Sequence, residues 1–136
     1  MRLALGAVPV AAAVALNGAV AAGLTPHDPV LGNYRGSGRA CYGMLTITTH
    51  RIFWTTPFSR CIGSPYDVRG KRDGADGVRM TFVLSRPGAR CRYPVLELTK
   101  RPGDDPAIGW EVAGYRSLDS GKRGGRDDSI SCYLYR

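Results

Sequence analysis

The residues with the most evident chemistry are four cysteines, Cys41, Cys61, Cys91 and Cys132. Cysteines can form disulfides, ligate zinc or act as nucleophiles, and their spacing separates these uses. No two of them stand at the C-x-x-C spacing that zinc sites favour, and no histidine lies in a context that would support a catalytic cysteine. An even number of cysteines favours two disulfides in an oxidising compartment.

The acidic residues offer no catalytic or metal-binding pattern. The only two glutamates, Glu97 and Glu111, alternate with apolar neighbours, so we expect both to point outward and to pair with arginine. The aspartate pairs lie in turn-like segments, without the closely spaced oxygen ligands of a calcium site. We therefore expect no catalytic residue, no metal and no cofactor. The arginines expected to pair with the glutamates are Arg79, Arg92 and Arg116.

Strands are the elements that must position these groups, because hydrophobicity alternates with a period of two. In VRMTFVLS, Met80 and Phe82 share one face while Arg79 and Thr81 share the other. No segment of a dozen residues favours a helix. Turn signals rich in Gly, Pro and Asp separate eight expected strands, at 33–40, 42–48, 52–57, 66–70, 78–85, 92–99, 108–116 and 129–135.

Eight antiparallel strands in about 100 residues favour an all-β, up-and-down eight-stranded barrel. A two-sheet β-sandwich is the competing architecture. The alternation also predicts the inward side chains, which are uniformly apolar. They are Leu45, Ile47, Ile52, Trp54, Val78, Met80, Phe82, Leu84, Leu96, Leu98, Ile108, Trp110, Val112, Ile130 and Leu134.

The segment CYGMLTITTHRIFWTTPFSRC, from Cys41 to Cys61, reads as a hairpin with its turn at Thr49-His50. Both cysteines lie at similar distances from that turn, so the two arms could bring them together. We favour the pairs Cys41–Cys61 and Cys91–Cys132, although four cysteines allow three connectivities. In an up-and-down meander all four cysteines fall at one end of the barrel.

The N-terminal segment has the pattern of a secretory signal peptide. A positive start is followed by an apolar, Ala-rich run and small residues suited to cleavage after Ala21 or Ala22. We expect residues 1–21 to be the cleaved signal, 22–30 an extended lead-in, and 31–136 a single domain. The mature chain would then be secreted or periplasmic, with no transmembrane segment, and we expect a monomer.

The sequence LGNYRG at residues 31–36 resembles the Gly-x-Trp opening of lipocalin-like (calycin-type) barrels. Gly32 matches the glycine, and Tyr34 stands where that family has tryptophan. The resemblance covers six residues and a strand count. It implies a small secreted β-barrel of a class that binds ligands or inhibits enzymes.

The Pro57–Pro65 loop is the most distinctive candidate for a contact surface. Two prolines stiffen it and Cys61 should anchor it, which leaves Phe58, Arg60 and Ile62 few ways to be buried. The chain carries a net charge of +8, and the meander places most of the excess at the cysteine-rich end. Together these observations suggest a binding surface made by Phe58, Arg60, Ile62, Arg86, Arg90, Arg92 and Arg123.

Three classes of function follow, in decreasing order of support. The first is a non-enzymatic binding or inhibitor-like module whose basic, disulfide-pinned loop end contacts an acidic protein, a glycan or an envelope surface. The second is a carrier of a small apolar ligand inside the barrel. The third is a hydrolase, which would need a cleft with a carboxyl of raised pKa. Nucleic acid is not an expected partner, since no binding motif is present.

Overall fold

The computed structural model describes residues 23–103, 105–123 and 128–136, and the expected signal segment 1–21 lies outside them. The described residues form nine strands and one short helix. In chain order these are β1 (Gly32–Gly36), β2 (Gly43–Ile47), β3 (Ile52–Thr56), β4 (Ser59–Ser64), β5 (Tyr66–Gly74), β6 (Gly77–Leu84), β7 (Val95–Lys100), β8 (Trp110–Tyr115), α1 (Leu118–Arg123) and β9 (Ser129–Tyr135).

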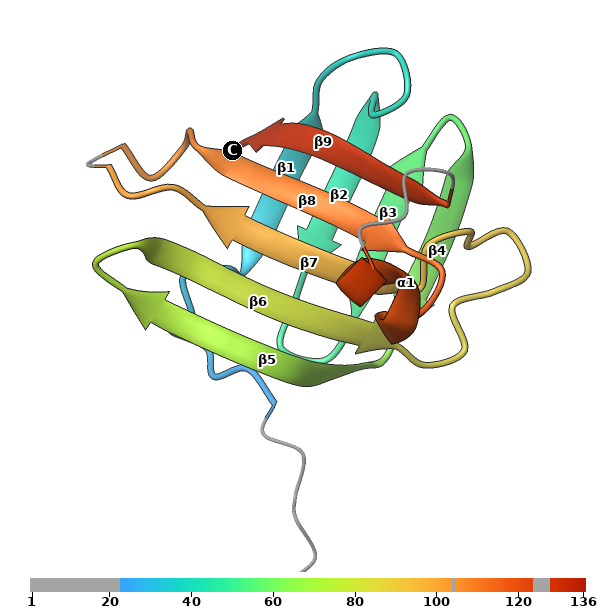
Figure 1. Cartoon of the computed structure of the whole chain (residues 1–136), viewed down its shortest axis with the longest axis horizontal. Helices are drawn as coiled ribbons and strands as arrows, with labels where there is room; N and C mark the ends of the chain where they lie inside the picture. The colour runs from blue at the N-terminus through green and yellow to red at the C-terminus, as the bar shows by residue number, and fades with distance from the viewer. Residues whose placement is uncertain (1–22, 104, 124–127) are drawn as a thin grey trace, which may run out of the picture.

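All nine strands belong to one curled antiparallel sheet, in the order β4-β3-β2-β1-β9-β8-β7-β6-β5 (Figure 1). The chain runs through β1 to β4, passes Pro65 to reach β5 at the opposite edge, and returns through β6 to β9 beside β1. The all-β prediction is confirmed as a curled half-barrel with two disulfides. The predicted number of eight strands was wrong by one, because β4 occupies a segment expected to be a loop.

The sheet consists of two half-sheets, which we define as β1–β4 and β5–β9. They meet at two seams. At the first seam β1 pairs with β9 through only Arg35–Tyr135 and Gly36–Leu134, whereas β1 and β2 pair over their full length. At the second seam the β6–β7 connection lies along β4, where the Arg60 amide donates to the Arg90 carbonyl at 2.9 Å. At each seam, only a few backbone hydrogen bonds join the two half-sheets.

Each seam carries one disulfide, and the pairing differs from the prediction. The bonds are Cys41–Cys132 at the first seam and Cys61–Cys91 at the second, with Cα–Cα separations of 5.5 and 4.5 Å. The favoured pairs Cys41–Cys61 and Cys91–Cys132 were wrong. Cys61 lies on β4, and β3 separates that strand from β2, so the two arms of the expected hairpin never bring Cys41 and Cys61 together.

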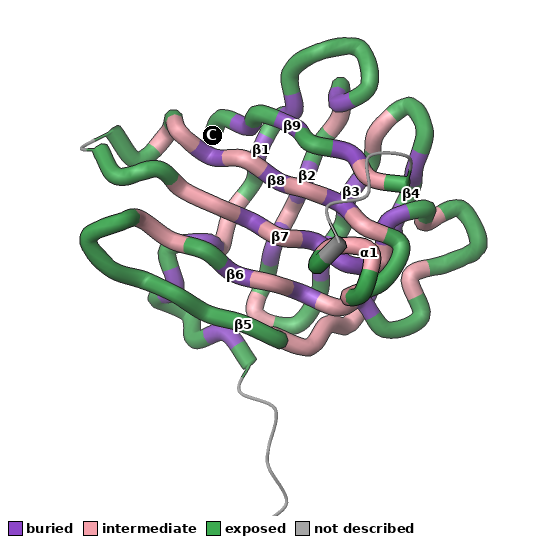
Figure 2. The backbone as a smooth tube through the Cα atoms, in the orientation of Figure 1, coloured by how far each residue is buried: buried purple, intermediate pink, exposed green. Residues whose placement is uncertain are grey.

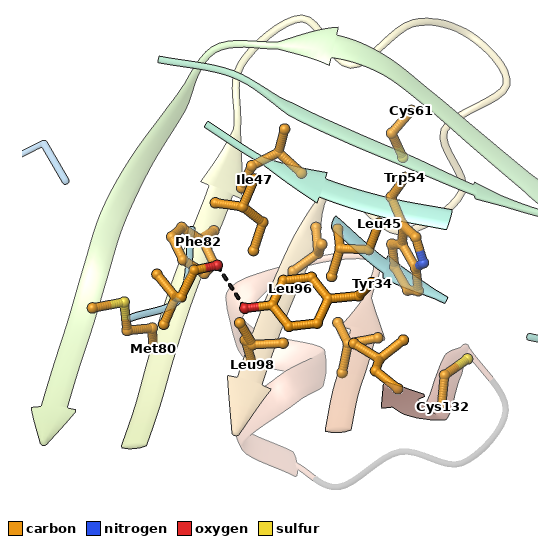
Figure 3. Packing of buried hydrophobic residues seen from close by; sticks show 14 of the residues in the cluster. Tyr34, Leu45, Ile47, Trp54, Cys61, Met80, Phe82, Leu96, Leu98 and Cys132 are labelled. Atoms are coloured by element: carbon orange, nitrogen blue, oxygen red, sulfur yellow. Dashed lines mark hydrogen bonds between the residues drawn. The ribbon is translucent and has the colours of Figure 1, made fainter. Parts of the chain in front are cut away.

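Buried and more exposed residues alternate along the strands, as predicted (Figure 2), and the buried side chains pack together on the inner face of the sheet (Figure 3). Trp54 and Trp110 point inward and are only 2–3% exposed, while Tyr133 and Tyr135 point outward. Ile108 was wrongly predicted to be inside, since it is 58% exposed. The reason is local: β8 begins at Trp110, and Gly109 has a φ of +81°, so the period of two does not extend back to Ile108.

Tyr34 occupies the centre of the core and was missing from the predicted interior. Its ring meets Trp110 edge-on at 5.2 Å between centroids, and its hydroxyl donates to the Val30 carbonyl at 2.7 Å (Figure 3). Burial raises the pKa of Tyr34 to about 12, although the positive charge of Arg136 opposes that shift. The tyrosine of the Gly-x-Tyr motif is therefore a core residue with a satisfied hydroxyl.

Arg136 closes the core over Tyr34. Its guanidinium lies 5.0 Å from the Tyr34 ring centroid and donates to the carbonyls of Pro29, at 2.8 Å, and Leu31. Gly32 makes this approach possible, because a Cβ there would lie 3.0 Å from an Arg136 nitrogen and its φ of +143° disfavours other residues. The motif thus supplies both the space and the aromatic surface for the last residue of the chain.

The segment before β1 packs against the sheet. Leu24 and Val30 are buried in the core, and turns at 26–27 and 29–30 fold the segment back. The buried carboxylate of Asp28 accepts a hydrogen bond from the Lys71 ammonium of β5 at 2.5 Å. This bond holds the pKa of Asp28 below its ordinary value, with burial acting in the opposite direction.

The helix α1 was not expected from the sequence. It lies over the outer side of the β5–β9 half-sheet (Figure 1), where a Cβ on Gly121 would lie 3.2 Å from the Tyr115 ring. The segment contains only six residues, which is too short for a sequence pattern to indicate a helix. In the part of the chain that the structure describes, neither this helix nor any other has the length and apolarity needed to cross a membrane.

Candidate functional site

The β3–β4 hairpin presents Phe58 at its tip. Pro57 and Phe58 form a two-residue turn between Thr56 and Ser59, which are paired across the hairpin. Proline suits the first of these positions because its fixed φ matches the turn. The Phe58 amide donates to the Thr56 hydroxyl at 3.3 Å, and its ring remains 63% exposed.

Residues 59–64 form a strand and not the loop that the two prolines suggested. Ser59 and Cys61 point inward and are buried, whereas Arg60 and Ile62 point outward and are exposed. The expected exposure of Phe58, Arg60 and Ile62 therefore agrees with the structure, but its cause is strand alternation.

The β6–β7 connection brings a second set of arginines to the hairpin. Besides the bond from the Arg60 amide to the Arg90 carbonyl, the Arg92 amide donates to the buried Ser59 hydroxyl at 2.9 Å. The Cys61–Cys91 bond joins the residues that directly follow Arg60 and Arg90. Arg60 and Arg90, which are distant in sequence, are thus adjacent at a rigid backbone junction.

Within the described part of the chain, Arg92 has an acidic ion-pair partner, whereas Arg60 and Arg90 have none. Arg92 and Arg116 both approach the Asp128 carboxylate, at 3.9 and 3.1 Å. The prediction that these two arginines pair with Glu97 or Glu111 was wrong. Arg79 does pair with Glu97, at 3.5 Å, and the unexpected partner of Glu111 is Arg101, at 3.1 Å.

The remaining two predicted site residues lie at the margins. Arg86 is exposed at the start of the β6–β7 connection, with a φ of +52°, four residues before Arg90. Arg123 is the last residue of α1, and its side chain is not among those described. The structure therefore brings Phe58, Arg60 and Arg90 together.

A shallow hollow marks this junction. It is lined by Thr56, Pro57, Phe58, Ser59, Arg60 and Arg90. Of the six ion pairs among the described residues, none involves Arg60 or Arg90. The hollow therefore offers two guanidinium groups without a carboxylate partner beside an exposed aromatic ring. Such a set can donate hydrogen bonds to carboxylate or phosphate oxygens.

Within the described residues, no three His, Cys, Asp or Glu side chains are grouped so that they could hold a metal ion. Comparisons with protein families, curated proteins and solved structures find no match to this chain.

Proposed function

We propose that this protein is an exported, non-enzymatic binding module whose basic, disulfide-pinned loop end contacts an acidic partner. The junction of the β3–β4 hairpin and the β6–β7 connection would form the centre of that contact, with Phe58, Arg60 and Arg90 as its principal residues. Carboxylate, sulfate or phosphate groups on an acidic protein, a glycan or an envelope surface would supply the anions.

One observation carries this proposal. The Arg60–Arg90 backbone bond and the adjacent Cys61–Cys91 disulfide fix side by side two arginines that have no ion-pair partner among the described residues. A preorganised backbone reduces the entropy that is lost on binding, and arginine can bind an oxyanion through two parallel hydrogen bonds. Arg92 and Arg116 share Asp128, so we assign them a smaller part.

For the fold, we propose a lipocalin-like barrel that is open between β4 and β5, in preference to a two-sheet sandwich. The order of the strands supports it, since the two edge strands follow each other in sequence through Pro65. A carrier function has less support. The interior rings pack on one another, with Tyr66 and Phe82 at 5.3 Å and Tyr34 and Trp110 at 5.2 Å.

The proposal is tested by charge reversal at the junction. Binding of the oxidised protein to immobilised poly-glutamate is measured over a range of salt concentrations. Arg60→Glu with Arg90→Glu should weaken binding about tenfold or more and flatten its dependence on salt, because two favourable charge contacts become repulsive. The matched control is Arg69→Glu with Arg72→Glu, which changes the net charge equally at two exposed positions of the β5 edge and leaves the Asp28–Lys71 pair intact.

The control pair should weaken binding by no more than about threefold. Equal losses from both pairs would show that only net charge matters, and the proposed site would have to be abandoned. Undetectable binding of the wild-type protein at low salt would also count against a basic contact surface.

A further inference from the structure

The outer face of strands β1–β4 and β9 carries a second group of exposed side chains that the loop end does not include. Apolar and aromatic residues alternate there with polar ones. We call this the acid-free face and define it by Arg35, Met44, Phe53, Ile62, Tyr133 and Tyr135, all of which are exposed.

Strand register makes the face continuous. Tyr135 is paired with Arg35, Arg35 with Met44, and Met44 with Thr55 of β3. Phe53 lies two residues from Thr55 on the same side of β3, so it is a diagonal neighbour of Met44. The Phe53 ring lies near Gly63, beside Ile62, on β4. Five neighbouring strands therefore contribute, spanning about 20 Å at the usual strand spacing.

This face contains no side-chain carboxylate. The sequence has no Asp or Glu between Asp28 and Asp67, and none after Asp128. The strands β1–β4 and β9 thus carry no acid at all, while arginine occurs on them at 35 and 60 and at 51 just before β3. The nearest acid on an adjoining strand is Glu111, opposite Tyr133, and its carboxylate pairs with Arg101.

The charge and shape of the acid-free face indicate which kind of partner it can bind. A second copy of the chain is disfavoured, since its own arginines would meet Arg35 and its neighbours. An acidic protein would need pockets for anchor side chains and a closely packed interface. The apolar side chains here instead stand singly on the convex side of the sheet, separated by threonines. A fluid bilayer requires no such complementarity, and it offers anionic headgroups above apolar chains.

We propose that the acid-free face docks on an anionic lipid bilayer. Met44, Phe53 and Ile62 enter the boundary between headgroups and acyl chains, and Arg35 binds lipid phosphate. Tyr133 and Tyr135 lie at the rim, where the tyrosine hydroxyl remains hydrated while the ring is buried. This contact adjoins the one proposed for Arg60 and Arg90, since Arg60 and Ile62 lie on the same side of β4, and it would hold the loop end near the membrane.

The first test is co-sedimentation of the oxidised protein with vesicles of phosphatidylglycerol and phosphatidylcholine in equal parts. Binding is expected to these vesicles and not to pure phosphatidylcholine. Met44→Ser with Phe53→Ser should lower the partition coefficient about tenfold or more, because two apolar side chains no longer enter the interface. Ile108→Ser, on the β7–β8 connection, should change it by less than about twofold.

The second test does not rely on removing a side chain. Ile62→Trp is compared with Ile108→Trp, since both positions are 58% exposed. Brominated phosphatidylglycerol vesicles should quench the tryptophan at 62 and not the one at 108. The two native tryptophans are buried and should not respond.

Three results would overturn this inference. They are no vesicle binding by the wild-type protein at low salt, equal quenching at positions 62 and 108, and equal losses from Met44→Ser with Phe53→Ser and from Arg69→Glu with Arg72→Glu. The poly-glutamate assay keeps the two proposals distinguishable, because Met44→Ser with Phe53→Ser should leave poly-glutamate binding unchanged. Retained poly-glutamate binding without vesicle binding would remove the membrane contact alone.

Discussion

The two half-sheets both contribute buried side chains to the core but differ on their outer faces. The outer side of β5–β9 places acids beside its arginines, as in Arg79–Glu97 and Arg101–Glu111, and α1 lies against Tyr115. The outer side of β1–β4 has no acid and exposes Met44 and Phe53, which are 48% and 40% accessible.

Folding alone does not require this difference. Both halves bury their inward residues to the same extent, including Leu45 and Ile47 on one side and Leu96 and Leu98 on the other. Exposed ion pairs add little stability, so the pairs on β5–β9 mainly neutralise that surface. The comparison indicates that β5–β8 present an exterior on which charges are paired, while β1–β4, together with β9, leave cations and apolar side chains available for contact.

The largest effect is expected at the seams that join the halves. Replacing Cys41 and Cys132 by serine opens a cross-link of 91 residues, and replacing Cys61 and Cys91 opens one of 30. The chain-entropy relation predicts losses of about 4–5 and about 3–4 kcal/mol in the free energy of unfolding. Equilibrium urea denaturation of the two double variants measures both values. If removing the Cys61–Cys91 bond lowers the free energy of unfolding more, the small number of hydrogen bonds at the second seam matters more for stability than the length of the closed loop.

A smaller effect is expected where the inner faces of the two halves meet. Gly114 of β8 faces Trp54 of β3, and a Cβ there would lie 2.7 Å from the indole ring. Gly114→Ala should therefore cost about 1–3 kcal/mol by overpacking. Gly74→Ala is the control, because nothing lies within 4 Å of its Cβ position. Thermal denaturation of both variants distinguishes them, and equal stability would mean that the core is loosely packed.

The smallest effect concerns the Asp28–Lys71 ion pair, in which the carboxylate is buried. The folded pKa of Asp28 is below its ordinary value, so this carboxylate stabilises the fold above the unfolded pKa of about 4 and loses that contribution as the pH falls through the folded pKa. Because Lys71 is half-exposed, Asp28→Asn should cost only about 1 kcal/mol at pH 7. The difference from wild type should vanish towards pH 2 in urea titrations. A constant difference at all pH values would assign the effect to packing.

Local patterns in the sequence predicted most of the strands. A period of two placed Trp54 and Trp110 inside and Tyr133 and Tyr135 outside, since each strand has one buried face. The strand β4 was missed although Ser59, Arg60, Cys61 and Ile62 alternate in the same way. The inner face of β4 carries serines, which are not hydrophobic, so the usual hydrophobic alternation is not seen there. The prolines on either side of the strand are also typical of loop ends.

Contacts between distant segments could not be predicted from such patterns. The disulfide pairing depends on which strands meet at the seams, and that depends on the path of the whole sheet. The contact of Arg136 with Tyr34 likewise joins the two ends of the domain. For the candidate site, the exposure of Phe58 and Arg60 was predictable from the sequence. The backbone bond between Arg60 and Arg90 was not, because it forms only where the folded sheet brings the β6–β7 connection against β4.

The two cross-links are nested, since the Cys61–Cys91 loop lies wholly inside the Cys41–Cys132 loop. In a chain that crosses a membrane N-terminus first, the inner bond can therefore form before Cys132 has emerged. At that stage Cys41 competes with Cys91 for Cys61, and closing the shorter loop from 41 to 61 is favoured entropically by only about 0.3 kcal/mol. When β4 pairs with β3, Cys61 is held one strand away from β2 and from Cys41. We therefore expect formation of the short β3–β4 hairpin to favour the native Cys61–Cys91 bond.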